Sequence, residues 1–327
     1  MTNYLHKVLP PQYSHVNKVY CLLAATVFCA LPLCSTEAAA ENILKYDGTT
    51  NIHGNAKTWA AKNEYDGIDI RVTGVDGGYY TDTTEALVLN NQTLNVKGKG
   101  KFVSIINTAQ NKQIDNNGGI YAKGGSTVNF TDVDSIYIAA IAGKEGGNDS
   151  TVISAKDPGR DLKGYTNIVN ISGTTVQLIG SIDVMHSLGS VFFNRNARHT
   201  VNAALSGSDS FWYGSAIGET DERTTVNLSL ADGATWIFNA GKSTLNAGGI
   251  IRNLKLDKGV VLFADAEVWE TYRKTVIKGT DYVLANYRDH NERYSQVEIR
   301  SLTGPGGIFK MDLDWQSNNG ERQYTEK

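Results

Sequence analysis

The stretch TTVNLSL, Thr224–Leu230, contains the pattern that decides the fold of this chain. Its apolar residues Val226, Leu228 and Leu230 alternate with polar residues. Successive side chains of an extended strand point to opposite faces, so this period of two separates the apolar residues from the polar ones. The stretch is therefore predicted to be a strand with one buried face and one face in water.

A short phrase that joins Thr, an apolar residue and Asn recurs along the chain. The related phrases are QTLNVKG (Gln92–Gly98), STVNFTD (Ser126–Asp132), TNIVNIS (Thr166–Ser172), HTVNAALSG (His199–Gly207) and STLNAGG (Ser243–Gly249). The asparagines of the phrases are Asn95, Asn129, Asn170, Asn202, Asn227 and Asn246. Their irregular spacing, roughly 20 to 40 residues, fits a stacked repeat whose loops differ in length. Asparagines at matching places are expected to form a ladder of side-chain amides.

Two architectures use strands of this kind. An antiparallel sandwich needs regular two-residue turns of the Asn-Gly or Asp-Gly type, and Asn117-Gly118 and Asp232-Gly233 are among the few candidates. A parallel stack needs only that strands and turns repeat along one axis. We favour a parallel coil of about 20 to 25 residues per turn. Alternating strands are also expected at Trp236 and Phe238, at Leu254 and Leu256, and over Phe309, Met311, Leu313 and Trp315.

The first forty residues have the three-part order of a secretory signal peptide. Lys7 and Lys18 lie in a polar beginning, the apolar run Val19–Cys34 follows, and small residues ending at Ala40 offer a cleavage site. A membrane anchor is the alternative, but the run is interrupted at Pro32 and is shorter than the ~20 residues that a bilayer needs. A lipoprotein signal is disfavoured because Leu33, not a small residue, precedes Cys34. We expect residues 1–40 to be removed on export.

The composition of the remaining body limits its chemistry. All three cysteines, Cys21, Cys29 and Cys34, lie in the leader, so the exported body is expected to contain no disulfide. A stack in which each coil bonds to its neighbours would supply rigidity instead. The net charge of the chain is −3 with no basic block, which gives no indication of nucleic acid or a charged membrane surface as a partner.

The second half of the chain resembles the passenger domain of a type V autotransporter, in its pertactin-like part. The phrases that show this are SDSFWYGSAI (Ser208–Ile217), TTVNLSLADGATWIF (Thr224–Phe238), LKLDKGVVLF (Leu254–Phe263) and VEIRSLTGPGGIFKMDLDW (Val297–Trp315). The resemblance implies an all-β fold, a right-handed single-stranded parallel β-helix. In that family the phrase similar to Leu302–Phe309 closes the passenger, and the region similar to Val297–Trp315 assists its folding coil by coil.

The resemblance divides the chain into four parts. Residues 1–40 are the signal peptide, 41–205 an N-terminal part of the passenger with long loops, 206–315 the pertactin-like coils, and 316–327 a polar tail. Members of the family continue into an outer-membrane β-barrel, and no such strands follow here. We therefore expect either a separate barrel translocator or a truncated, nonfunctional autotransporter fragment.

Serine-protease chemistry is disfavoured by the sequence. The body contains His53, His186, His199 and His290, and neither Gly-Asp-Ser-Gly nor G-x-S-x-G occurs in it. His186 is adjacent to Ser187, but adjacent strand residues point to opposite faces. The histidines are therefore interpreted as loop or packing residues. The mixed stretch Val191–His199 is interpreted as a strand that enters a basic turn.

Paired carboxylates are the second candidate for catalysis. Asp132 and Asp134 share a strand face by the period of two, as do Asp312 and Asp314, and such pairs serve glycan-cleaving enzymes or bind cations. The simpler interpretation is that outward strand positions are charged for solubility. We assign no catalytic, cofactor-binding or metal-ligating residue.

Glycine-rich and aromatic stretches are candidates for recognition. Ala142–Ser150 and Val72–Thr84 contain neither a calcium repeat nor a P-loop, and are interpreted as long turns that would carry any partner contact. Tyr79-Tyr80 and Trp212-Tyr213 can stack on sugars or a protein, although packing inside the stack is favoured for SFWYGS.

The expected function is that of a non-enzymatic surface passenger, an adhesin or a stalk, whose partner is a host or neighbouring-cell surface protein or glycan. The alternative is a β-helical polysaccharide lyase or hydrolase.

Overall fold

A computed structural model describes residues 42–50, 63–74, 84–109, 117–141, 151–156, 164–184, 196–218, 222–238, 248–263, 296–310, 313–318 and 321–326. The chain divides into two units, Met1–Ala40 and Glu41–Lys327. The predicted leader lies outside the described residues. All secondary structure in the described residues is strand, which confirms the all-β class. No helix in these ranges could therefore span a membrane.

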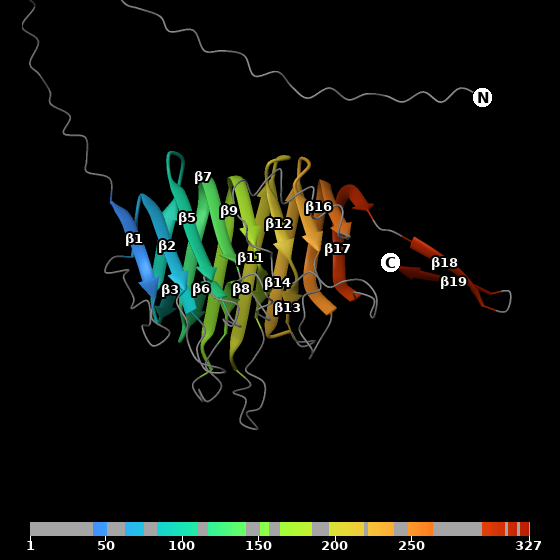
Figure 1. Ribbon diagram of the computed structural model, residues 1–327, viewed down its shortest axis with the longest axis horizontal. Coiled ribbons are helices and arrows are strands. Elements are labelled where there is room, and N and C mark those ends of the chain that lie inside the picture. The colour runs from blue at the N-terminus through green and yellow to red at the C-terminus, as the bar shows by residue number, and fades with distance from the viewer. Residues whose placement is uncertain are drawn as a thin grey trace, which may run out of the picture. The chain divides into compact units, whose positions relative to one another are not determined.

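The strands of the second unit pair almost entirely in parallel, as the coil predicts and the sandwich does not. Figure 1 shows them side by side in chain order from β1 to β17. Ile43 pairs with Gly67, 24 residues later, and Gly248 pairs with Gln296, 48 residues later. The predicted coil length of about 20 to 25 residues is thus too short for most coils, because connecting segments of different length separate the paired strands. The architecture is solenoid-like.

The described strands of the stack form three sheet faces, and face one holds the Asn phrases. It consists of β4 (Thr93–Lys97), β11 (Arg198–Ser206), β14 (Thr224–Ala231) and the first parts of β7 (Thr127–Ile141), β9 (Thr166–Ile179), β16 (Gly248–Phe263) and β17 (Gln296–Lys310).

Face two follows face one along the chain from β4 onward. It consists of β1 (Ile43–Thr50), β2 (Gly67–Gly74), β5 (Phe102–Ala109), β12 (Phe211–Gly214), β15 (Thr235–Phe238) and the second parts of β7, β9, β16 and β17. Because β9 and β16 belong to both faces, the pairing β9-β11-β14-β16-β15-β12 returns to β9 and closes a ring of six strands.

Face three is a separate five-stranded sheet. It consists of β3 (Thr84–Asn90), β6 (Asn117–Lys123), β8 (Thr151–Ala155), β10 (Ser181–Asp183) and β13 (Ala216–Ile217). The remaining strands, β18 (Leu313–Asn318) and β19 (Glu321–Glu326), form an antiparallel hairpin that includes most of the predicted polar tail. The alternation predicted for one strand over Phe309–Trp315 is divided between two, because β17 ends at Lys310 and β18 begins at Leu313.

Tight corners join face one to face two. Asp132, Asp232 and Lys258 have positive φ angles of 59°, 52° and 61° at these corners. In the last corner Gly304 has φ 108°, and a Cβ on it would lie 2.1 Å from the carbonyl oxygen of Leu256. The glycine-rich segment Leu302–Phe309 therefore contains a corner, across which the register of β17 against β16 shifts without interrupting the strand.

The interior is a set of apolar rows that run from coil to coil. One row on face one is Val96, Phe130, Ile171, Ala203, Leu228, Leu254 and Leu302. One row on face two is Tyr46, Ile70, Ile105, Ile138, Leu178, Trp212, Trp236, Val261 and Phe309. Most members are buried completely, and in TTVNLSL the three apolar residues are inside as predicted. Close packing of these rows supplies the hydrophobic stabilisation of the stack.

Candidate functional site

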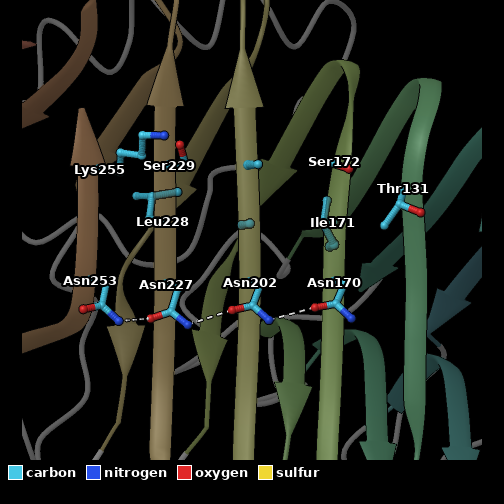
Figure 2. A pocket seen from close by; sticks show the side chains of 12 residues that line it. Thr131, Asn170, Ile171, Ser172, Asn202, Asn227, Leu228, Ser229, Asn253 and Lys255 are labelled. Atoms are coloured by element: carbon cyan, nitrogen blue, oxygen red, sulfur yellow. Dashed lines mark hydrogen bonds between the residues drawn. The ribbon is translucent and has the colours of Figure 1, made fainter. Parts of the chain in front are cut away.

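The candidate site is a hollow on the outer surface of face one, over β9, β11, β14 and β16. Figure 2 shows it above a line of asparagine side chains. The residues that line it are Thr131, Asn170, Ile171, Ser172, Asn202, Ala203, Ala204, Asn227, Leu228, Ser229, Asn253 and Lys255.

The predicted amide ladder borders this hollow. Asn253 Nδ2 donates to Asn227 Oδ1 at 2.6 Å, and Asn227 Nδ2 donates to Asn202 Oδ1 at 2.7 Å (Figure 2). The series continues from Asn202 to Asn170 at 2.7 Å, from Asn170 to Asn129 at 2.8 Å, and from Asn129 to Asn95 at 2.9 Å. Every amide donates toward the N-terminal side, and the last bond, at 3.0 Å, reaches the Asn63 carbonyl.

The membership of the ladder differs from the prediction at one end. Asn253 of β16 occupies the sixth place, and Asn246 lies outside the described residues. The phrase around Asn246 contains the expected letters, whereas Asn253 follows an arginine and was not singled out. Each ladder bond contributes about 0.5–1.5 kcal/mol, because these amides exchange water for one another.

A second row of residues forms the upper side of the hollow. Thr131, Ser172, Ala204, Ser229 and Lys255 each lie two positions after a ladder asparagine, so they point outward with it. Ala204 is exposed and has the shortest side chain of this row, which leaves the space. Lys255 is the only titratable residue in the lining. The row was missed in the sequence, although aligning the Asn phrases and reading two positions onward would have found it.

His199 is the one predicted histidine that the described residues include, and its role is in packing. It is fully buried at the start of β11, and Asn167 Nδ2 lies 3.2 Å from its Nδ1. Asn167 Oδ1 in turn accepts bonds from the backbone N–H groups of Gly125 and Ser126 at 2.9 and 3.0 Å. This geometry makes Nδ1 the acceptor, so the imidazole is held by a hydrogen bond from Asn167 at the start of β11. His53, His186 with Ser187, and His290 lie outside the described residues.

The predicted carboxylate pairs are not assembled into a site by the described residues. Asp132 and Asp134 are both exposed, with the buried Val133 between them. Asp134 Oδ2 accepts a hydrogen bond from the backbone N–H of Gly100 at 3.1 Å, so it pairs a backbone group in a corner of the preceding coil. Asp312 is outside the described residues, and Asp314 is described only as part of β18.

The aromatic residues of SFWYGS pack inside the stack, as favoured. Trp212 and Trp236 are buried and stack with ring centroids 5.1 Å apart and planes 6° apart. Their Nε1 groups donate to the carbonyls of Gly180 and Gly214 at 2.9 and 3.0 Å. Tyr213 is also buried, so the sugar-stacking alternative for Trp212-Tyr213 is wrong. Tyr79-Tyr80, Ala142–Ser150 and most of Val72–Thr84 lie outside the described residues.

Two titratable groups have shifted pKa values, and both lie away from the hollow. The backbone N–H of Asn42 and the ammonium of Lys101, 3.2 Å away, lower the pKa of Asp66. Burial raises the pKa of the Tyr137 phenol. A further ion pair joins Lys156 to the buried Asp183 on face three, a contact that no sequence spacing indicated.

The described residues contain no group of three His, Cys, Asp or Glu side chains that could hold a metal ion. No protein-family model matches the chain, and no curated protein or solved structure matches it. The hollow is therefore interpreted from its own chemistry, which is amide, hydroxyl and methyl groups beside one ammonium group.

Proposed function

We propose that this chain is a non-enzymatic passenger of the type V autotransporter kind, built as a right-handed single-stranded parallel β-helix. It is exported by its leader, is moved outward by an outer-membrane β-barrel translocator, and acts at the cell surface as an adhesin or stalk. Its partner is a surface protein or glycan of a host or neighbouring cell.

The observation that supports this proposal most directly is the chemistry of the face-one hollow. Its amides are already bonded to one another in a fixed row, and its serine and threonine hydroxyls face outward in register. Such groups form hydrogen bonds with the hydroxyls of a glycan or the polar groups of a protein. A single lysine with no carboxylate in the lining does not provide the acid–base pair that glycan cleavage requires.

Rigidity without disulfides supports the role of a stalk. Parallel pairing continues from β1 to β17, and the ladder crosses six strands of face one. Each coil is thereby bonded through backbone and side chain to its neighbours, and a stack of this kind holds an outward surface in one conformation.

Attachment of beads coated with the full chain tests the proposal. We expect them to attach to epithelial monolayers or bacterial suspensions about tenfold more than uncoated beads. Ala204→Trp fills the hollow and is expected to abolish that gain, whereas Thr200→Trp, on the same strand but outside the lining, is expected to retain it.

A second assay separates attachment from catalysis. The same preparation is incubated with acidic and neutral polysaccharides, and new reducing ends or unsaturated products are measured. Product formation would overturn the non-enzymatic assignment. Equal attachment by wild-type and uncoated beads would overturn the role in adhesion, and a gain retained by Ala204→Trp would overturn the role of the hollow.

A further inference from the structure

The outward row beside the amide ladder has a lysine at each end. Its members lie two positions after a ladder asparagine on neighbouring strands, and they are Lys97, Thr131, Ser172, Ala204, Ser229 and Lys255. Lys97 pairs with Thr131 and lies just beyond the lining of the hollow. The row crosses six strands, a span of about 24 Å at the ordinary strand spacing. We refer to these six residues as the lysine-ended row.

The charges of the two lysines are not neutralised by the protein. Lys97 and Lys255 are both exposed, and neither forms an ion pair or a side-chain hydrogen bond within the described ranges. Asp132 and Asp257 are the acidic residues that follow the row most closely along β7 and β16, and no ion pair joins either of them to these lysines. The row therefore has two uncompensated positive charges, which favour an anionic partner.

Hydroxyl groups between the lysines can donate to a ligand. Ser172 Oγ accepts a hydrogen bond from the backbone N–H of Asp132 at 3.2 Å, which leaves its own hydrogen to donate. The hydroxyls of Thr131 and Ser229 form no hydrogen bond to any described residue. Figure 2 shows these three side chains and Lys255 around the hollow, where Ala204 leaves the space.

The backbone beneath the row disfavours a peptide strand as the ligand. β9, β11 and β14 are each paired on both sides, so their main-chain groups are already bonded. An extended peptide that adds to a sheet needs a free strand edge. A partner over the row is therefore bound by side-chain hydroxyl, amide and ammonium groups alone, which suits a chain of sugars. Two lysines about 24 Å apart match sparse carboxylates better than the dense charge of a sulfated glycan.

We propose that the lysine-ended row binds a linear glycan that contains carboxylated sugars. The glycan lies across the strands, with a carboxylate at Lys97 and another at Lys255. Sugar hydroxyls between these two points form hydrogen bonds with the hydroxyls of the row. This inference rests on the proposed adhesive function, and it narrows the partner from a surface protein or glycan to an acidic glycan.

Binding of defined oligosaccharides to the full chain, measured by calorimetry, tests the proposal. The probes are octasaccharides of polygalacturonate and of hyaluronan, each beside its methyl ester, which has the same sugars without the charge. We expect at least one of the two acids to bind about tenfold more tightly than its ester, because charged hydrogen bonds are the stronger ones.

Two lysine variants locate the carboxylates. Lys97→Gln and Lys255→Gln are each expected to weaken binding of that acid about three- to fivefold, as exposed ion pairs do. The double variant is expected to weaken it about 10- to 25-fold, because sites this far apart act independently. Lys310→Gln removes an exposed lysine of β17 outside the row and is expected to leave the affinity unchanged.

Each other outcome overturns the inference. Equal binding of the acids and their esters means that charge is not recognised, and equal weakening by Lys310→Gln means that the attraction is not local to the row. Tighter binding of a heparin octasaccharide or of polyglutamate means that the partner is a sulfated glycan or an acidic protein. No binding of any acid means that the row has no ligand of this class.

The bead assay distinguishes this failure from failure of the proposed function. Beads that attach to cells although neither acid binds the chain would overturn the acidic glycan and leave the adhesive role intact. Beads that do not attach, with tight binding of an acid that depends on both lysines, would overturn the adhesive role and leave the ligand class intact.

Discussion

Face one and face two belong to the same coils, but the outer sides of their strands differ in burial. On face one, Leu228 is inside while Asn227 and Ser229 meet solvent, so the strand is dry on one side only. On face two, Trp236 is inside and its neighbour Ile237, on the opposite side, is equally buried. The prediction that each strand has one wet face is therefore correct for face one and wrong for this part of face two. Alternation of apolar and polar residues therefore occurs only in strands whose outer side is exposed to water.

The largest expected effect on stability is that of a substitution inside face two. Trp236→Ala removes the stacking partner of Trp212 and leaves the Gly214 carbonyl without its indole donor. We expect a loss of about 3–5 kcal/mol in the free energy of unfolding, measured by urea denaturation. Thr225→Ala, on the outer side of face one, is the control and is expected to change stability by less than about 0.5 kcal/mol. Similar losses in both variants would show that the interior of face two contributes no more to stability than the outer side of face one.

The corner between the two faces is expected to be the next most sensitive position. Gly304→Ala combines a positive φ of 108° with a Cβ 2.1 Å from the Leu256 carbonyl oxygen. Gly306→Ala has φ 136° but no heavy atom within 4 Å of the added Cβ. We expect Gly304→Ala to cost about 1–3 kcal/mol and Gly306→Ala to cost less, because only the former adds a steric clash to backbone strain. The midpoints of thermal unfolding measure the difference, and a reversed order would refute this account of the corner.

The amide ladder is expected to contribute less than the tryptophans. Asn202→Ala removes two side-chain bonds, to Asn170 and from Asn227, whereas Asn253→Ala removes the single bond to Asn227. We expect losses of about 1–2 and 0.5–1 kcal/mol respectively, because net hydrogen-bond contributions at half-exposed positions are modest. Equal losses in urea denaturation would indicate that the ladder is not a series of separate bonds.

The smallest expected effects depend on pH. The folded pKa of Tyr137 is raised by burial, so the unfolded chain releases its proton first as pH rises through about 10, and stability is lost above that pH. The folded pKa of Asp66 is lowered, so its contribution is present above the unfolded value near 4 and is lost as pH falls below it. Stability curves against pH for Tyr137→Phe and Asp66→Asn are expected to be flatter at the alkaline and acid ends respectively. Curves unchanged from wild type would show that these two groups do not couple to folding.

Local pattern was enough to predict face one. The Thr-apolar-Asn phrases specify strands of period two, and five of the six predicted asparagines lie in the ladder, since identical amides in register bond to one another wherever strands stack in parallel. The candidate hollow was not predicted, because it arises where Ala204 lies between Ser172 and Ser229 of neighbouring coils, which are separated by 32 and 25 residues in the chain.

By itself, the sequence determined the strand class, the parallel stacking, the apolar rows and the absence of cysteine after Cys34, because each depends on residue type and on neighbours along the chain. Only the tertiary structure decided the length of each coil, the burial of Ile237 on the outer side of face two, and the exposure of Leu302 on β17. The physical reason is that burial is a property of what lies across the sheet and in the next coil. Leu254 and Leu302 share a residue type and an interior row, and they differ in that a described strand pairs beyond Leu254 and none pairs beyond Leu302.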